Sequence, residues 1–107
     1  MKEYLERLDN LVEEVARKPV LSRAENRIFC LLKTKGEKAV RGREIDKHEF
    51  EVKEKSGLLS LCMKLEGRSA MPLARQLCER FEDRSELKFA RVFETKRGAQ
   101  LVLRVNG

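Results

Sequence analysis

The sequence contains no tryptophan, one tyrosine, one histidine and three cysteines without a Cys-x-x-Cys pair. An odd number of cysteines cannot pair completely within one chain, so we expect free thiols and not a disulfide framework or a zinc site. One histidine, with no motif around any serine or cysteine, offers no nucleophilic catalytic site. No apolar run approaches the roughly 18 residues of a membrane span, and no signal peptide is recognisable. We therefore expect a cytoplasmic protein without a membrane partner, metal or cofactor.

Charge is abundant and unevenly placed. The chain has 107 residues, of which 41% are hydrophobic and 39% charged, which is typical of one globular domain spanning residues 1–107. Its net charge of +6 is concentrated in two regions, with an excess of +4 in residues 19–48 and +3 in residues 69–107, while the rest sums to −1. Two basic regions of this kind can form one footprint for phosphate. An ordinary solvated surface is the alternative interpretation.

Two helices are predicted in the first third. An apolar stripe of Leu and Val predicts a helix over residues 2–18, which Pro19 ends. Ser22 and Glu25 have the spacing of a capping box, which predicts a helix over residues 23–34 with Gly36 as its stop. Residues 39–41 then favour a short strand.

The middle of the chain fits two templates. Alternating residues from Phe50 onward indicate a strand. Residues 57–66 alternate as a strand does, but they also match helical spacing, and they contain Leu, Met, Lys and Glu without a β-branched or aromatic residue. With Ser56 as N-cap and Gly67 after the end, composition favours a helix.

The last third combines an amphipathic helix with a hairpin. Residues 70–84 place apolar side chains along one helical face and Arg, Gln, Glu and Asp along the other. Strands are predicted over residues 88–95 and 100–106, joined by a turn that contains Lys96, Arg97 and Gly98. Intrahelical ion pairs, Arg75 with Glu79 and Arg80 with Asp83, are the structural alternative to a binding role for these arginines.

From residue 22 onward this order of elements resembles a winged helix-turn-helix domain, with the features of residues 22–45 matching that family's opening helix and first strand. The resemblance implies an α+β fold that is mainly helical, with an extra N-terminal helix and a C-terminal β-hairpin as the wing. It implies a small transcriptional regulator or replication accessory factor that prefers certain sequences of double-stranded DNA. Helix 70–84 would then enter the major groove. The resemblance implies that bases are contacted by Ser69, Met71, Arg75 and Gln76, and phosphate by Arg80 and Arg84. It also implies that the DNA backbone or minor groove is contacted by Lys96 and Arg97 at the wing tip.

The helix over residues 2–18 is not needed by such a domain. It either packs on its own domain or pairs with the same helix of a second copy, which would make a homodimer with the two-fold symmetry that many DNA readers use.

Two further interpretations remain open. Glu51-Val52-Lys53, with Asp46 and Glu25, is similar to the metal-binding motif of PD-(D/E)xK nucleases, although such a triplet arises easily in a chain this rich in charge. If residues 58–66 form a strand, the fold becomes three helices and two hairpins, typical of an α+β module that binds protein or RNA without catalysis.

Overall fold

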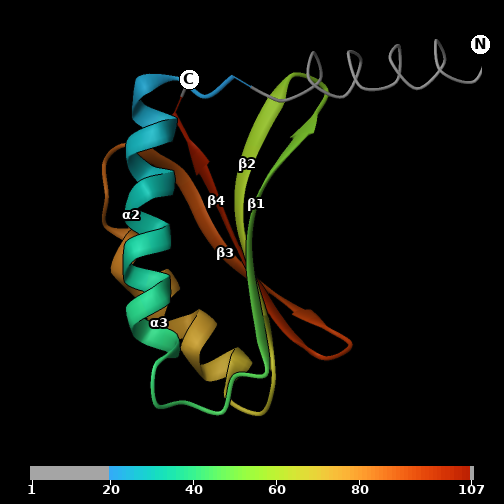
Figure 1. The fold of residues 1–107 in the computed structure, drawn as a ribbon. Helices are drawn as coiled ribbons and strands as arrows, with labels where there is room; N and C mark the ends of the chain where they lie inside the picture. The colour runs from blue at the N-terminus through green and yellow to red at the C-terminus, as the bar shows by residue number, and fades with distance from the viewer. Residues whose placement is uncertain (1–19, 107) are drawn as a thin grey trace, which may run out of the picture.

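Two helices and two β-hairpins alternate along residues 20–106. The structure is a computed structural model, and it describes residues 20–106. Figure 1 shows the elements in their order along the chain: α2 (Arg23–Val40), β1 (Lys47–Lys55), β2 (Leu58–Glu66), α3 (Ala70–Glu82), β3 (Leu87–Thr95) and β4 (Gly98–Val105). The predicted helix over residues 2–18, and the dimer proposed to form through it, lie outside the described residues.

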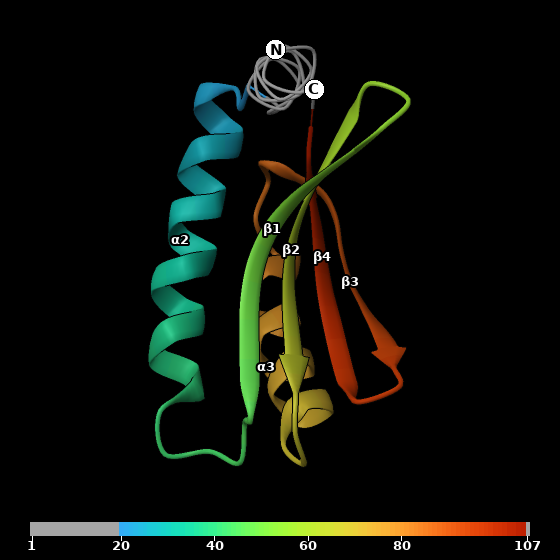
Figure 2. The same cartoon turned by 45° about the vertical axis from the view of Figure 1, so that its right-hand side comes forward.

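The four strands form one antiparallel sheet in the order β1-β2-β4-β3. Each hairpin supplies two neighbouring strands, and the hairpins join where β2 pairs with β4. Because β2 and β4 are antiparallel, the tips of the two hairpins project at opposite ends of the twisted sheet (Figures 1 and 2). The sheet therefore has two edge strands, β1 and β3.

Both helices pack against the same face of this sheet. Alternate residues of the two central strands, such as Leu61, Met63, Leu101 and Leu103, are 0–1% exposed and form one core with the apolar sides of α2 and α3. The helices contribute to this core Ile28, Phe29 and Leu32 from α2, and Ala70, Leu73, Ala74, Leu77, Cys78 and Phe81 from α3. Within residues 20–106, no helix covers the opposite face.

The prediction of a helix over residues 57–66 is wrong, because this segment is β2. As a central strand it is hydrogen-bonded on both sides, to β1 and β4. Alternation places Leu61, Met63 and Leu65 in the core and Cys62 on the other face. The preceding turn also suits a hairpin, since Ser56 and Gly57 have positive φ angles of 54° and 78°. Burial and pairing across the sheet outweigh the helical preference of Leu, Met, Lys and Glu.

The predicted fold class is also wrong, because it depended on that helix. Without a helix over residues 57–66, the element directly before α3 is strand β2. The two elements cannot form a helix-turn-helix unit, so the winged helix-turn-helix fold is wrong. Strands hold 40% of the described residues and helices 36%, so this part of the protein is α+β but not mainly helical. The two hairpins of the alternative α+β architecture are the ones present.

Residues 35–41 also differ from expectation. They contain neither a helix stop at Gly36 nor a strand over 39–41, because α2 continues to Val40. Gly36 is buried, and a Cβ atom there would lie 2.8 Å from Cζ of Phe50 and 2.9 Å from Sδ of Met63. The glycine therefore allows α2 to approach the sheet closely. It does not end the helix.

Other local predictions are confirmed. The Ser22 backbone N–H donates to Oε1 of Glu25 at 2.8 Å, and the Glu25 N–H donates to Oγ of Ser22 at 3.1 Å, as in a capping box. The helix predicted over residues 70–84 is α3, which ends at Glu82. The C-terminal hairpin is β3 paired with β4. None of the helices in residues 20–106 has the length and hydropathy needed to cross a membrane.

The three thiols provide a test of this packing. Cys30 is exposed, whereas Cys62 and Cys78 are buried. Burial raises the pKa of the Cys62 thiol, and burial together with the Glu82 carboxylate raises the pKa of Cys78 to about 11. Because the thiolate is the reactive form, a raised pKa leaves little of it at about pH 8. We expect an aromatic disulfide reagent to modify one thiol per native chain and all three in denaturant. Rapid reaction of a second thiol without denaturant would contradict the burial of β2 or α3.

Candidate nucleic-acid interface

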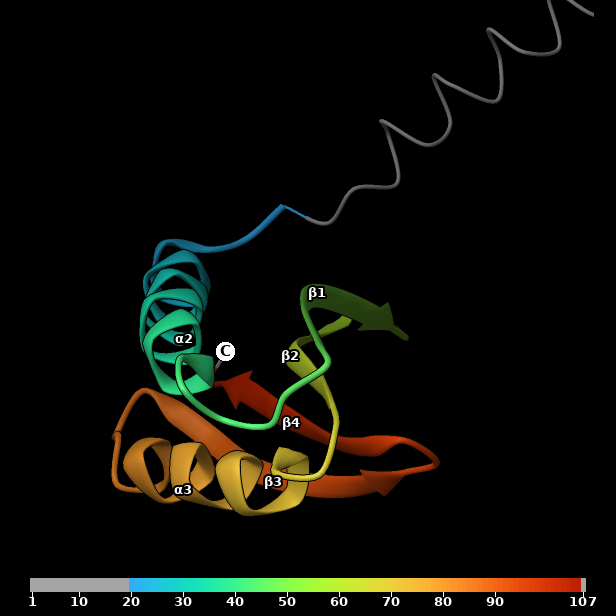
Figure 3. The same cartoon turned by 60° about the horizontal axis from the view of Figure 1, so that its bottom comes forward.

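The largest hollow on the helical side is a groove between α2 and α3, with a volume of about 570 Å³. Figure 3 shows α2 nearly end-on beside α3. Ala39 of α2 lines the groove, and each helix also contributes four side chains at the spacing i, i+3, i+4, i+7, which places these four on one helical face. From α2 these are Leu31, Thr34, Lys35 and Lys38, and from α3 they are Leu73, Gln76, Leu77 and Arg80. The leucines on both helices pack with the core, so polar and cationic side chains remain to face the solvent.

The short connection after α2 adds two more cations to this groove. Arg41 and Arg43 follow the last turn of the helix and line the groove together with Lys35, Lys38 and Arg80. Hydrogen bonds hold this connection, with the Arg41 N–H donating to the Lys38 carbonyl and the Arg43 N–H to the Val40 carbonyl. Further along, the Asp46 N–H donates to the Glu66 carbonyl at 2.8 Å, which ties the connection to the end of β2. The two arginines are therefore presented by a hydrogen-bonded turn.

Among residues 20–106, no carboxylate lines the groove. Its ionisable side chains are two lysines and three arginines. Among the ion pairs within residues 20–106, none involves any of these five side chains. Cations near the C-terminal end of α2 interact favourably with the helix dipole, which accounts for some of them structurally. Five cations around one groove nevertheless create a positive potential that attracts anions. We call Lys35, Lys38, Arg41, Arg43 and Arg80 the groove cations.

The residues predicted to bind DNA do not form one surface. Gln76 and Arg80 line the groove. Among the ion pairs of residues 20–106, neither Arg75–Glu79 nor Arg80–Asp83 is present, so the structural alternative for these two arginines is wrong. Arg75 instead lines a separate hollow between α3 and β3, with Glu79 and Glu82. At 100° per residue, Arg75 and Arg80 lie at opposite flanks of the exposed face of α3.

The remaining predicted residues are scattered further. Ser69 is at the N-cap position of α3 without a side-chain capping bond, and its N–H donates to the Glu44 carbonyl. The Arg84 guanidinium lies 5.9 Å from the ring centre of Phe81. Lys96 and Arg97, in the β3–β4 turn, line a third hollow on the other side of the molecule.

Four of the groove cations were not predicted as site residues. They lie in the region where the sequence has its larger positive excess, so charge distribution was the available signal. What the sequence did not indicate was that the second half of α2 lies beside α3, which combines Lys35 and Lys38 with Gln76 and Arg80.

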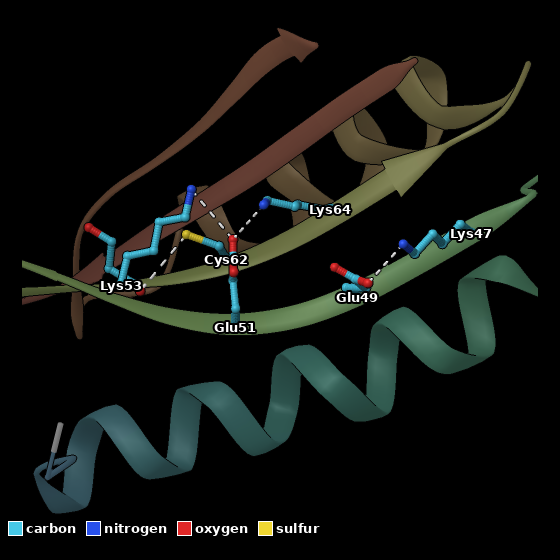
Figure 4. A network of polar contacts seen from close by, with 7 residues as sticks. Lys47, Glu49, Glu51, Lys53, Cys62 and Lys64 are labelled. Carbon is cyan, nitrogen blue, oxygen red and sulfur yellow. Dashed lines mark hydrogen bonds and ion pairs between the residues drawn. The ribbon is translucent and has the colours of Figure 1, made fainter. Parts of the chain in front are cut away.

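The carboxylates of the nuclease interpretation do not assemble. Glu25 caps α2, and Asp46 precedes β1. Glu51 lies on the uncovered face of the sheet, where its Oε1 is 3.1 Å from Nζ of Lys64 and 3.4 Å from Nζ of Lys53 (Figure 4). Within the described residues, no group of three or more His, Cys, Asp and Glu side chains could hold a metal ion.

The same ion pairs set the ionisation of this face. Burial by itself raises the pKa of Glu51, but the hydrogen bond from Lys64 and the charges of Lys53 and Lys64 outweigh it and hold the pKa below its ordinary value. The hydrogen bond that Lys64 donates to Glu51, together with the negative charge of Glu51, raises the pKa of Lys64. Glu51 is thus a charged partner of two lysines. The only histidine, His48, is also engaged, with Nε2 at 3.0 Å from Oε1 of Glu37.

Comparison with known protein families, with curated proteins and with solved structures finds no match to this chain.

Proposed function

We propose that the protein binds the phosphate backbone of double-stranded DNA in the groove between α2 and α3. The observation that carries this proposal is the set of five groove cations, with no carboxylate from residues 20–106 in the lining. Three of them are arginines, whose planar guanidinium groups can donate two parallel hydrogen bonds to one phosphate. The overall charge of +6 adds long-range attraction to a polyanion.

The groove favours a duplex over a single strand. The part of the chain that the structure describes contributes no aromatic side chain to its lining. Proteins that hold single strands usually combine cations with aromatic rings on which the unpaired bases stack. A surface with cations but without rings suits a nucleic acid whose bases are already stacked inside a helix, so that only phosphates and sugars are offered.

The direct test is a fluorescence anisotropy titration with labelled duplexes of about 20 base pairs at low salt. We expect saturable binding, with similar affinity for duplexes of unrelated sequence, because phosphate contacts carry no sequence information. Absence of saturable binding to any duplex at low salt would contradict the proposal and favour the alternative of a protein-binding module.

Replacing Arg75 by alanine separates backbone binding from the sequence reading predicted for this residue. Arg75 is exposed and lies across α3 from the groove, so we expect Arg75→Ala to change affinity less than about twofold on every duplex. A guanine contact by Arg75 would instead cost about 1–3 kcal/mol on one preferred sequence and far less on the others. Titration of the variant with a panel of duplexes distinguishes the two results.

A further inference from the structure

The face of the sheet that neither helix covers has a different chemistry from the groove. Along β3 and β4, the residues that point away from the core include Phe89, Arg91, Phe93, Gln100 and Arg104. Phe93 is 48% exposed, which makes it one of the few large apolar side chains in residues 20–106 that the fold leaves open. An exposed phenyl ring on a sheet face contributes little to folding, but it offers a flat apolar surface to a ligand.

Arginines surround the neighbouring aromatic ring. The guanidinium carbon of Arg91 lies 4.5 Å from the ring centre of Phe89, and that of Arg104 lies 5.1 Å from the same centre. Across the strand pair, Phe89 is opposite Arg104, and Phe93 is opposite Gln100. Along β3, two rings therefore alternate with a guanidinium group, and Arg104 of β4 adds a second guanidinium group. Both kinds of group stack on nucleobases.

A cationic hollow lies at the β3–β4 turn, and its lining includes Gln100, the residue opposite Phe93. It has a volume of about 380 Å³ and is lined by Lys53, Lys64, Lys96 and Arg97, together with Gln100, Thr95 and Leu65. Glu66 is the single carboxylate that residues 20–106 contribute to its lining. The adjacent Glu51 is paired with Lys53 and Lys64, so its charge is largely compensated (Figure 4). The hollow thus has an excess of positive charge, and it is connected to Phe93 through Gln100, which pairs with Phe93 across the two strands.

We propose that the uncovered face of the sheet binds a single strand of nucleic acid. One base stacks on Phe93, and the adjoining phosphates lie against Lys64, Lys96 and Arg97. Exposed rings and cations together match the two chemical parts of a nucleotide, the π-face of the base and the anionic phosphate. This surface is distinct from the groove between α2 and α3, which has cations without rings. The inference does not depend on duplex binding.

The absence of tryptophan from the sequence makes stacking directly observable. Phe93→Trp introduces a single indole, whose fluorescence is quenched when a base stacks on it. We titrate this variant with thymidine and uridine oligonucleotides of about 12 nucleotides. We expect saturable quenching, with the two oligonucleotides showing whether DNA or RNA binds better. Val20→Trp is the matched control, since Val20 is 90% exposed and lies outside the sheet, and we expect no saturable quenching from it.

Removal of the Phe93 ring provides a second test of the proposal. Stacking on an aromatic ring contributes enough for Phe93→Ala to weaken single-strand binding about tenfold. We expect its affinity for duplex DNA to be unchanged, and its thermal unfolding to match the wild type because Phe93 is exposed on an edge strand. The proposal would be overturned if the fluorescence of Phe93→Trp were not quenched, or if Val20→Trp were quenched equally. It would also be overturned if Phe93→Ala bound single strands as tightly as the wild type.

Discussion

Neutralising three of the groove cations is expected to weaken duplex DNA binding by roughly two to three orders of magnitude at about 0.1 M salt. The triple variant Lys38→Gln/Arg41→Gln/Arg80→Gln removes one cation from α2, one from the turn and one from α3. Each neutralised phosphate releases counterions, which contributes about 0.9 decades of affinity at that salt concentration. Glutamine keeps a polar group and the first two methylenes of lysine and arginine, so packing next to the backbone of the groove is preserved.

The matched control removes the same charge elsewhere. Arg23→Gln/Arg27→Gln/Lys88→Gln changes three exposed cations that do not line the groove. Both variants carry a formal charge three units below that of the wild type, so long-range attraction falls equally. We expect the control to lose less than about threefold in affinity, because no phosphate contact is removed. Equal losses in the two variants would mean that net charge alone attracts DNA, and that the groove has no special role.

Gly98→Ala is expected to lower the free energy of unfolding by about 3 kcal/mol, the upper part of the range for overpacking. Gly98 begins β4, opposite Glu66 of β2, at the junction of the two hairpins. A Cβ atom there would overlap the carbonyl oxygen of Leu65 and lie 2.8 Å from Cβ of Ala70. The first neighbour is backbone in a central strand, so relief requires the hairpins to separate or α3 to shift.

Gly57→Ala is the comparison for this effect. Gly57 has a φ of 78°, but a Cβ atom there would contact nothing within 4 Å. Its cost is the left-handed conformation alone, about 1–2 kcal/mol. Urea denaturation of both variants, followed by circular dichroism, measures the difference. Equal destabilisation by the two substitutions would contradict the close approach of β2, β4 and α3 described here.

The parts of the fold that the sequence predicted correctly depend on local interactions. The start of α2 follows from Ser22 and Glu25, which bond to each other's backbone within one turn. The apolar side of α3 follows from helical spacing, and the last hairpin from a short turn between two alternating segments. In each case the deciding residues are neighbours in the chain.

The failures depend on contacts between distant segments. Residues 58–66 have the composition of a helix, and only pairing with β1 and β4 makes them a strand. Gly36 has the appearance of a helix stop, but it marks the approach of α2 to Phe50 and Met63. The groove forms only where α2 lies beside α3. The charge distribution of the sequence indicated the cations of α2 and of the connection after it, but it did not show that Gln76 and Arg80 of α3 lie opposite them. Both the groove and the uncovered sheet face are products of tertiary packing.

The salt dependence of duplex binding tests the central proposal most directly. Association constants measured by anisotropy between about 0.05 and 0.3 M salt should give a straight line of log K against log salt, with a slope of about −0.9 for each phosphate contacted. For the variant Lys38→Gln/Arg41→Gln/Arg80→Gln we expect a slope shallower by about three units, and for the control Arg23→Gln/Arg27→Gln/Lys88→Gln the slope of the wild type. A wild-type slope retained in the groove variant would show that these cations do not contact the phosphates, and would contradict DNA binding in the groove between α2 and α3.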